Sequence, residues 1–258
     1  MQQVVLSKIK KPALLLMLCF SALFLFSFGP KPLVKPAIVW QHVNFLSPWT
    51  YTLPGTTPAN FAATHQFIYD SLDLESIGLS RHVFELALKG MEKLQMAGKL
   101  QYNILSIADF SKSSTEKRLY VIDLDQASLL FHTWVAHGRN SGEEMARSFS
   151  NKPRSKKSSL GFYVTGQTYF GSNGFSLKLE GMENGINNNA RQRAIVIHGA
   201  DYVNERYIQS QGFIGRSQGC PAVMSSVSGP LINTIKEGTC LFIYHPTSTY
   251  TSRSSFLR

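Results

Sequence analysis

The sequence predicts a mainly β (α+β) domain with a helical segment at its start and one helix before its last strand. Seven short runs rich in β-branched and aromatic residues lie between residues 103 and 245, and turn residues separate them. An apolar periodicity of three to four residues precedes the first run, and a shorter helical stretch precedes the last. Strands grouped between two helical stretches are typical of α+β or mainly β domains.

Residues 1–28 indicate export. Three lysines, Lys8, Lys10 and Lys11, precede the uncharged apolar run "PALLLMLCFSALFLFSFG", which is the pattern of a secretory signal peptide. The run is also near the lower length limit of a membrane-spanning helix, so residues 13–28 could instead remain as a membrane tether. Both alternatives place the rest of the chain in the periplasm or elsewhere in the cell envelope.

The following segments are predicted in chain order. Residues 29–58 contain six prolines and indicate an extended tether. Residues 59–100 predict a helical segment packed on the domain; Ser80 is its N-cap candidate and Gly98 its end. One face of that helix is predicted to carry Val83, Ala87, Met91 and Leu94. Residues 101–246 hold the strands and a helix around residues 229–236, and residues 247–258 are expected to be a polar tail.

The net charge of the chain is +10, and it is +7 without residues 1–28. A cationic exported protein suits an anionic surface such as a cell wall or lipid headgroups. Nucleic acid is not an expected partner, because the chain carries an export signal and no basic-aromatic motif. No metal site and no cofactor are expected, since neither C-x-x-C nor H-x-x-x-H occurs.

One histidine and one cysteine form the candidate catalytic pair. His198 ends the strand run "RAIVIHG", and Cys220 follows Gly219 in the turn "RSQGCP". A thiolate is a nucleophile, a nearby histidine can take up its proton, and backbone N–H groups in a tight turn can stabilise an oxyanion. On the residues alone, a core histidine and a buried thiol remain the alternative. Cys240 lies in the apolar run "TCLFIYH" and is expected to be a core residue.

The sequence resembles the murein L,D-transpeptidase catalytic domain family, which has the YkuD-like fold. The resemblance rests on "VAHGRNSG" (135–142), on residues 149–203 and on "GRSQGCPAV" (215–223), and it covers roughly residues 60–245. The order His before Cys also fits this family, whereas papain-like enzymes have the opposite order. The family implies a β-rich domain that attacks an acyl bond of a peptidoglycan stem peptide next to a diaminopimelate, through a cysteine thioester.

The resemblance implies a role for each matching residue. Cys220 corresponds to the nucleophile, His198 to the general base, and the Gly199 carbonyl to the group that orients the imidazole. The N–H groups of Gly219 and Cys220 correspond to the oxyanion hole, and Arg216 and Ser217 to the flank that shapes the site. Gln218 and the pair Pro221-Ala222 depart from the wider fold, which bears on how the donor is held.

Three further residues are candidates for substrate binding. Arg139 and Asn140 could bind a substrate carboxylate, because arginine offers a bidentate fork. Tyr202 follows the predicted base closely and could line the pocket. The predicted function is a peptidoglycan L,D-transpeptidase. One alternative is an L,D-carboxypeptidase or endopeptidase of the same fold that uses water as acceptor, and another is a wall-binding module without catalysis.

Overall fold

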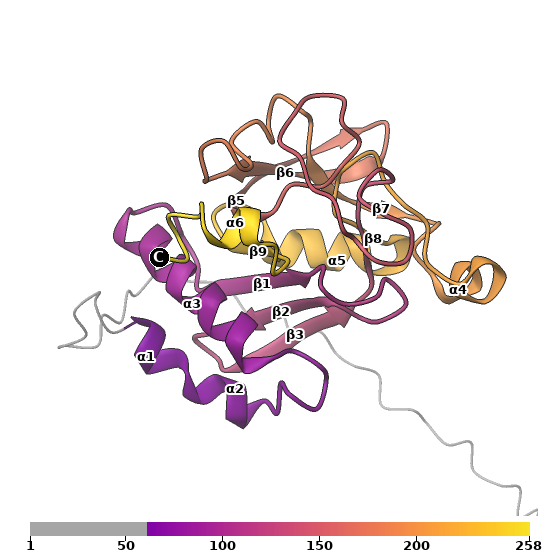
Figure 1. Cartoon of the computed structure of the whole chain (residues 1–258). Helices are drawn as coiled ribbons and strands as arrows, with labels where there is room; N and C mark the ends of the chain where they lie inside the picture. The colour runs from indigo at the N-terminus through magenta and orange to yellow at the C-terminus, as the bar shows by residue number, and fades with distance from the viewer. Residues whose placement is uncertain (1–60) are drawn as a thin grey trace, which may run out of the picture. The chain divides into compact units, whose positions relative to one another are not determined.

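A computed structural model describes residues 61–258, which form a nine-stranded mixed sheet with helices packed against it (Figure 1). The predicted signal or anchor (1–28) and the tether (29–58) lie outside the described residues. Among residues 61–258, no helix is long and apolar enough to span a membrane. The predicted mainly β (α+β) class is confirmed.

The strands run in the order β3-β2-β1-β9-β5-β6-β7-β8-β4 across the sheet. Their bounds are Ile104–Asp109 (β1), Leu119–Asp123 (β2), Ser128–Thr133 (β3), Val135–Ala136 (β4), Gly161–Gly171 (β5), Gly174–Gly181 (β6), Val196–Ala200 (β7), Ala222–Met224 (β8) and Cys240–Tyr244 (β9). The pairs β1–β9 and β7–β8 are parallel, and the other pairs are antiparallel. Each of the seven predicted runs contains a strand, and β8 is an addition that the sequence did not predict.

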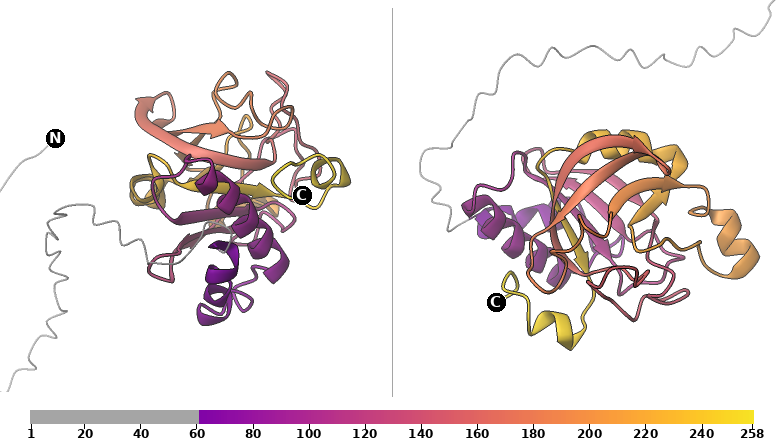
Figure 2. Two further views of the ribbon diagram at one scale, coloured as in Figure 1. Left: turned by 90° about the vertical axis from the view of Figure 1, so that its left-hand side faces the viewer. Right: turned by 90° about the horizontal axis from the view of Figure 1, so that it is seen from above.

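The hairpin of β5 and β6 lies in the middle of the strand order and curves strongly (Figure 2). Its pairing register shifts between Thr165 and Thr168, and such a bulge bends a strand and increases its twist. The hairpin turn therefore lies near the end of β7, since Ser176 of β6 pairs with His198.

Helix α3 (Arg81–Met96) has the N-cap and the buried face that the sequence predicts. The Ser80 hydroxyl accepts a hydrogen bond from the Val83 N–H at 3.3 Å. The four predicted face residues are all buried, and the helix packs against β1 and β9. Gly90 allows this close approach, because a Cβ there would lie 2.0 Å from the Phe162 ring of β5.

Helix α5 (Ser225–Ile235) begins four residues before the expected Gly229 and packs against β6, β7 and β8. Gly229 and Pro230 suggested a later start, since proline removes a backbone donor from a helix. Pro230 and Ser226, the residue whose carbonyl would otherwise accept that donor, are both exposed, where the loss of the bond costs least.

The shorter helices are α1 (Phe61–His65), α2 (Phe67–Ser71), α4 (Glu205–Gln211) and α6 (Ser248–Thr251). Helix α4 projects from the body at the side of the molecule where β7 and β8 end (Figure 1). Helix α6 lies in the segment assigned to a polar tail, and in the structure this segment is packed: Tyr250 and Ser254 are buried. Both donate hydrogen bonds to Glu183, and Lys93 of α3 binds the Ser255 carbonyl at 2.6 Å.

Asn187 organises the loop between β6 and β7. Its amide nitrogen donates to the carbonyls of Leu160 and Phe162 at 3.0 and 2.9 Å, and its oxygen accepts the Glu183 N–H at 2.8 Å. The side chain is fully buried, so water cannot replace these bonds. The loop is therefore fixed to β5 although its sequence indicates only a turn-rich connection.

Asn187→Ala should lower the free energy of unfolding by about 3 kcal/mol, because it leaves buried backbone groups without partners. Urea titration of the variant against the unchanged protein measures this loss. Asn233→Ala, on the exposed side of α5, is the control and should change the value by less than about 0.5 kcal/mol. An equal effect of both substitutions would contradict the role assigned to Asn187.

Candidate active site

His198 lies near the end of β7 with its imidazole orientation fixed. The strand is paired on both sides, with Ser176 of β6 and Ala222 of β8 opposite His198. The His198 Nδ1 lies 2.9 Å from the Gly199 carbonyl oxygen. A proton on Nδ1 donates this bond, which leaves Nε2 as an acceptor. Gly199 has no room for a side chain, because a Cβ would lie 2.5 Å from the Ser228 hydroxyl of α5.

Cys220 lies in a loop that two neighbouring segments hold. Ser217 forms a parallel bridge with Gly138. The Ser217 N–H donates to the His137 carbonyl at 3.0 Å, and the Ser217 carbonyl accepts the Arg139 N–H at 2.8 Å. The Ser158 hydroxyl accepts from Gly138 N–H at 3.0 Å and donates to the Gly219 carbonyl at 3.1 Å. The "VAHGRNSG" segment thus supports the cysteine loop directly.

Glycine at 219 is a steric requirement of this loop. Its φ is +129°, a conformation that residues with a side chain rarely adopt. A Cβ there would also lie 2.9 Å from the Lys157 carbonyl oxygen. The Ser217 hydroxyl closes the turn, accepting the Gly219 N–H at 2.9 Å and donating to the Cys220 carbonyl at 2.6 Å. In this conformation the predicted oxyanion donor of Gly219 is therefore occupied by Ser217.

His198 and Cys220 line one cavity of about 340 Å³. Six of the nine predicted site residues contribute to its wall, namely His198, Gly199, Tyr202, Arg216, Ser217 and Cys220. Gln218 and Ala200 line it as well, and Asn173 does so from the β5–β6 turn. Sequence reasoning did not single out Asn173, which reaches the cavity because β6, the strand that follows the turn, pairs with β7.

Arg139 lines a neighbouring cavity of about 310 Å³ that shares Tyr202, Arg216 and Gln218 with the first one. Tyr207 and Gln211 of α4 complete this second wall. Asn140 lines neither cavity: its side chain donates to the Ser155 carbonyl at 2.9 Å and holds the basic loop of residues 152–157. The structure thus brings Arg139 near the site and gives Asn140 a contact within a loop.

The Cys220 thiol is buried in this conformation. It is 8% exposed, and its Sγ donates to the Ala194 carbonyl at 3.6 Å. Burial raises the pKa of the thiol above its ordinary value, while a hydrogen bond from the Val196 backbone and the charge of Arg193 lower it. The pKa of the thiol lies above its ordinary value in this conformation, because desolvation outweighs the favourable neighbours.

Tyr202 and Arg216 shape the cavity mouth. Burial raises the pKa of Tyr202 to about 12, so its phenol remains protonated at neutral pH. Arg216 donates to the Gly142 carbonyl at 3.1 Å and lies 5.3 Å from the centre of the Phe213 ring. Its nearest carboxylate oxygen, on Glu143, is 3.9 Å away, so the guanidinium keeps donors for a ligand.

His137 is a structural histidine beside the buried Arg118. Its Nδ1 lies 2.8 Å from Arg118 Nη2, and the pKa of His137 falls to about 3 because of burial and the charge of Arg118. Arg118 also donates to the Val135 carbonyl from two nitrogens at 3.0 and 3.1 Å. The neutral imidazole connects this core cluster to Gly142, whose carbonyl also binds Arg216.

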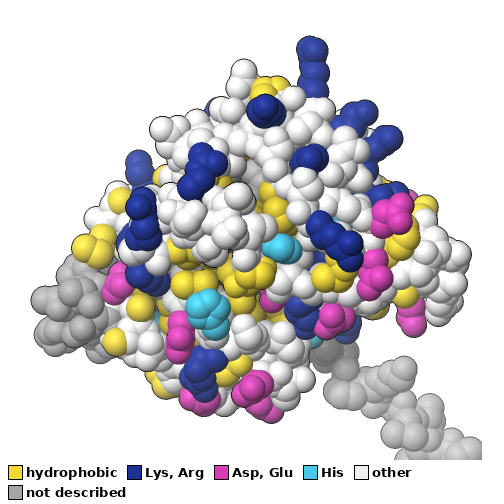
Figure 3. Space-filling view, viewed as in Figure 1, with side chains coloured by type: hydrophobic (Ala, Val, Ile, Leu, Met, Phe, Trp, Pro, Cys, Tyr) yellow, Lys and Arg dark blue, Asp and Glu magenta, His cyan; other side chains and the backbone are white. Residues whose placement is uncertain are grey.

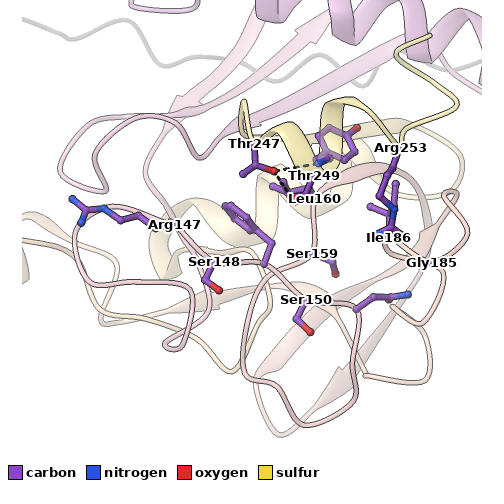
Figure 4. A pocket seen from close by; sticks show the side chains of 13 residues that line it. Arg147, Ser148, Ser150, Ser159, Leu160, Gly185, Ile186, Thr247, Thr249 and Arg253 are labelled. Carbon is purple, nitrogen blue, oxygen red and sulfur yellow. Dashed lines mark hydrogen bonds between the residues drawn. The ribbon is translucent and has the colours of Figure 1, made fainter.

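A separate cavity of about 320 Å³ lies between the loop of residues 147–151 and the C-terminal segment (Figure 4). Hydroxyl and amide side chains dominate its wall, with Arg147 and Arg253 at its rim and no predicted site residue among them. Figure 4 shows Ser150 and Ser159 on one side of it and the short helix α6 on the other. Of these two cavities, the one lined by Cys220 and His198 carries a nucleophile and a base, so it is the candidate active site.

Basic side chains are scattered over the upper part of the molecule in the orientation of Figure 1, while acidic ones lie mostly along its lower part and one side (Figure 3). In the basic loop of residues 152–157, Lys152, Arg154 and Lys156 are exposed. Within residues 61–258, no group of three or more His, Cys, Asp or Glu side chains is placed to hold a metal ion. Both described cysteines are free, and Cys240 is fully buried in β9 as expected.

The family model of the L,D-transpeptidase catalytic domain matches residues 75–244. No functionally curated protein matches the chain in sequence. Among solved structures, an L,D-transpeptidase from Mycobacterium smegmatis is 10% identical with a TM-score of 0.35, over 56% of this chain and 59% of that one. The chain therefore spans about six-tenths of the length of that relative.

Two further solved structures are similar at the same level. An L,D-transpeptidase from Stackebrandtia nassauensis is 13% identical with a TM-score of 0.33, over 74% of this chain and 80% of that one. A variant of the helical cell shape determining protein Pgp2 from Campylobacter jejuni is 14% identical with a TM-score of 0.35, over 62% and 57%. These scores are too low to carry an argument, so the assignment rests on the match over residues 75–244.

Proposed function

Because the chain belongs to the L,D-transpeptidase catalytic domain family, we propose that it is a cysteine acyltransferase acting on peptidoglycan stem peptides. One observation carries the proposal: Cys220 and an imidazole oriented by the Gly199 carbonyl line the same cavity. The pairing of β7 with β8 brings them together, since His198 lies opposite Ala222, two residues after the cysteine.

The proposed reaction has two halves. Cys220 Sγ attacks the carbonyl carbon of the donor amide, its proton passes to His198 Nε2, and the leaving amine takes that proton as the amide bond breaks. An acceptor amine then attacks the thioester and gives a proton to His198, which returns it to the departing sulfur. General-base removal of the proton at the moment of attack suits a thiol whose pKa is raised by burial.

The cavity wall suggests how a donor is held. Arg216 and Arg139 place two guanidinium groups at the joined cavities, where carboxylates of a stem peptide can bind as bidentate partners. The Cys220 N–H is the oxyanion donor of this proposal, and Gly219 N–H joins it if the Ser217 hydroxyl turns away. The exposed basic loop at residues 152–157 fits an anionic wall polymer.

Product analysis separates transfer from hydrolysis. Purified protein incubated with disaccharide-tetrapeptide should yield cross-linked dimer alongside some hydrolysed tripeptide, resolved by liquid chromatography and mass spectrometry. Transfer requires that the site position the amine and keep water from the acyl carbon. Only tripeptide at saturating acceptor would favour the L,D-carboxypeptidase alternative.

Replacing Tyr207 and Phe213 together by Ala should raise the tripeptide-to-dimer ratio several-fold. Tyr207 lines the neighbouring cavity, and Phe213 supports Arg216 at the shared wall, so both cover the path of the acceptor. Tyr102→Ala is the matched control, because this exposed aromatic lines neither cavity. An unchanged tripeptide-to-dimer ratio in the double variant would show that Tyr207 and Phe213 do not control which acceptor reacts.

A peptidoglycan substrate implies a place of action outside the cytoplasm. The apolar run of residues 13–28 with its preceding lysines supports export into the periplasm or cell envelope, with cleavage or with retention as a membrane tether. The mass of the protein in a cell-envelope fraction, compared with that of the full chain, distinguishes cleavage from retention.

A further inference from the structure

Arg193 lies at the end of the loop between β6 and β7, five residues before the proposed base. Its guanidinium makes four hydrogen bonds, all to neutral acceptors of the 150–159 loop. Nη1 donates to the Ser150 carbonyl at 2.8 Å and the Ser159 hydroxyl at 2.9 Å. Nη2 donates to the Lys157 carbonyl at 2.6 Å and the Ser155 hydroxyl at 3.3 Å. None of the ion pairs within residues 61–258 includes Arg193.

A half-buried guanidinium without a carboxylate partner is unusual, because desolvating a charge costs free energy that neutral acceptors offset only in part. The structure places that unneutralised charge next to the cysteine loop. A Cβ on Gly219 would lie 3.3 Å from Arg193 Nη2 and 2.9 Å from the Lys157 carbonyl that the same nitrogen binds. The guanidinium is thus packed against the backbone of the residue before the nucleophile.

The electrostatics agree with this placement. Burial raises the pKa of the Cys220 thiol and lowers that of Arg193; against burial, the charge of Arg193 lowers the thiol pKa and the cysteine raises the pKa of Arg193. The other titratable or charged groups at the thiol's cavity are His198, Tyr202 and Arg216. Lys157 presents its carbonyl to Gly219 and directs its ammonium to the Ser148 hydroxyl at 2.7 Å.

We propose that Arg193 is a positioning residue for the nucleophile. Its guanidinium fixes the 150–159 loop against Gly219, and its positive charge stabilises the thiolate form of Cys220. The thiolate form arises both when Cys220 loses its proton and when the thioester breaks, so one fixed charge assists both halves of the reaction. The catalytic role of Arg193 rests on the proposed function. The interaction between its charge and the Cys220 sulfur can be measured without a substrate.

The test is the pH profile of Cys220 alkylation by iodoacetamide in the full chain, read at Cys220 by peptide mapping. Arg193→Gln should slow alkylation at pH 7.5 about tenfold and move the profile to higher pH, because the thiolate loses a neighbouring positive charge. Arg193→Lys keeps the charge but not the fork, so it should stay within about threefold of the unchanged protein. Arg191→Gln is the matched control: this arginine is two residues away, exposed and paired with Glu180 at 2.9 Å, and its removal should leave the profile unchanged.

The direction of the change separates the proposal from a purely structural role. If Arg193 only held the loop, Arg193→Gln would loosen the loop, hydrate the thiol and move the profile to lower pH. That result, or a profile equal to that of Arg191→Gln, overturns the proposal. Since no donor peptide is present, a failure of the transferase assay leaves this test unaffected, and a null result here leaves the acyl-transfer proposal intact.

Discussion

Cys220→Ala should abolish turnover of peptidoglycan fragments, with a loss of at least about 10⁴-fold, and should remove covalent labelling at the cavity. The reason is chemical, because no other nucleophilic side chain of the cavity can form the thioester. The fold should persist, since the loop is held by Ser217, Gly138 and Ser158 and not by the sulfur. Steady-state assays with disaccharide-tetrapeptide and a urea titration measure the two effects.

Cys240→Ala is the control for that substitution. Its thiol is fully buried in β9, and burial raises its pKa, so it should neither react nor contribute to turnover. The substitution should cost about 1 kcal/mol of stability through a small cavity. Loss of labelling in Cys240→Ala with labelling retained in Cys220→Ala would reverse the assignment.

His198→Gln should lower kcat/KM by about 10²–10⁴-fold, the usual effect of losing a general base. The strand should remain in place, because backbone pairing with β6 and β8 holds it on both sides. The residual activity should rise with pH, because the buried thiol must then ionise without a base. His82→Gln, on the exposed side of α3, is the control and should keep full activity. A pH profile of His198→Gln that matches the unchanged protein would exclude His198 as the base.

The sequence was informative about local patterns. Alternating β-branched and aromatic runs predicted each long strand, and Ser80 with its apolar face predicted α3. It did not predict β8, a three-residue strand that exists only through pairing with β7 and β4. The early start of α5 was also not predictable, because a proline is tolerated in a helix where it and the residue four positions before it are exposed.

The candidate site was predictable where chemistry depends on residue type, and less so where it depends on packing. His198 and Cys220 could be found from their residue types and order. The occupied Gly219 N–H follows from the turn geometry of Ser217, which the sequence does not specify. Arg193 appeared to belong to a turn-rich connection, since its partners lie 34 to 43 residues away in the chain. Asn173 reaches the cavity only through the curved hairpin.

The most direct test of the account is the intact mass of the protein after brief mixing with disaccharide-tetrapeptide and quenching in acid. A thioester mechanism predicts a mass increase equal to the donor acyl group, located at Cys220 by peptide mapping and released by hydroxylamine. The adduct should be absent in Cys220→Ala and should accumulate more slowly in His198→Gln. Product formation without an adduct, or an adduct at another residue, would contradict the assignment of Cys220. Substrate binding with neither adduct nor product would instead support a wall-binding module without catalysis.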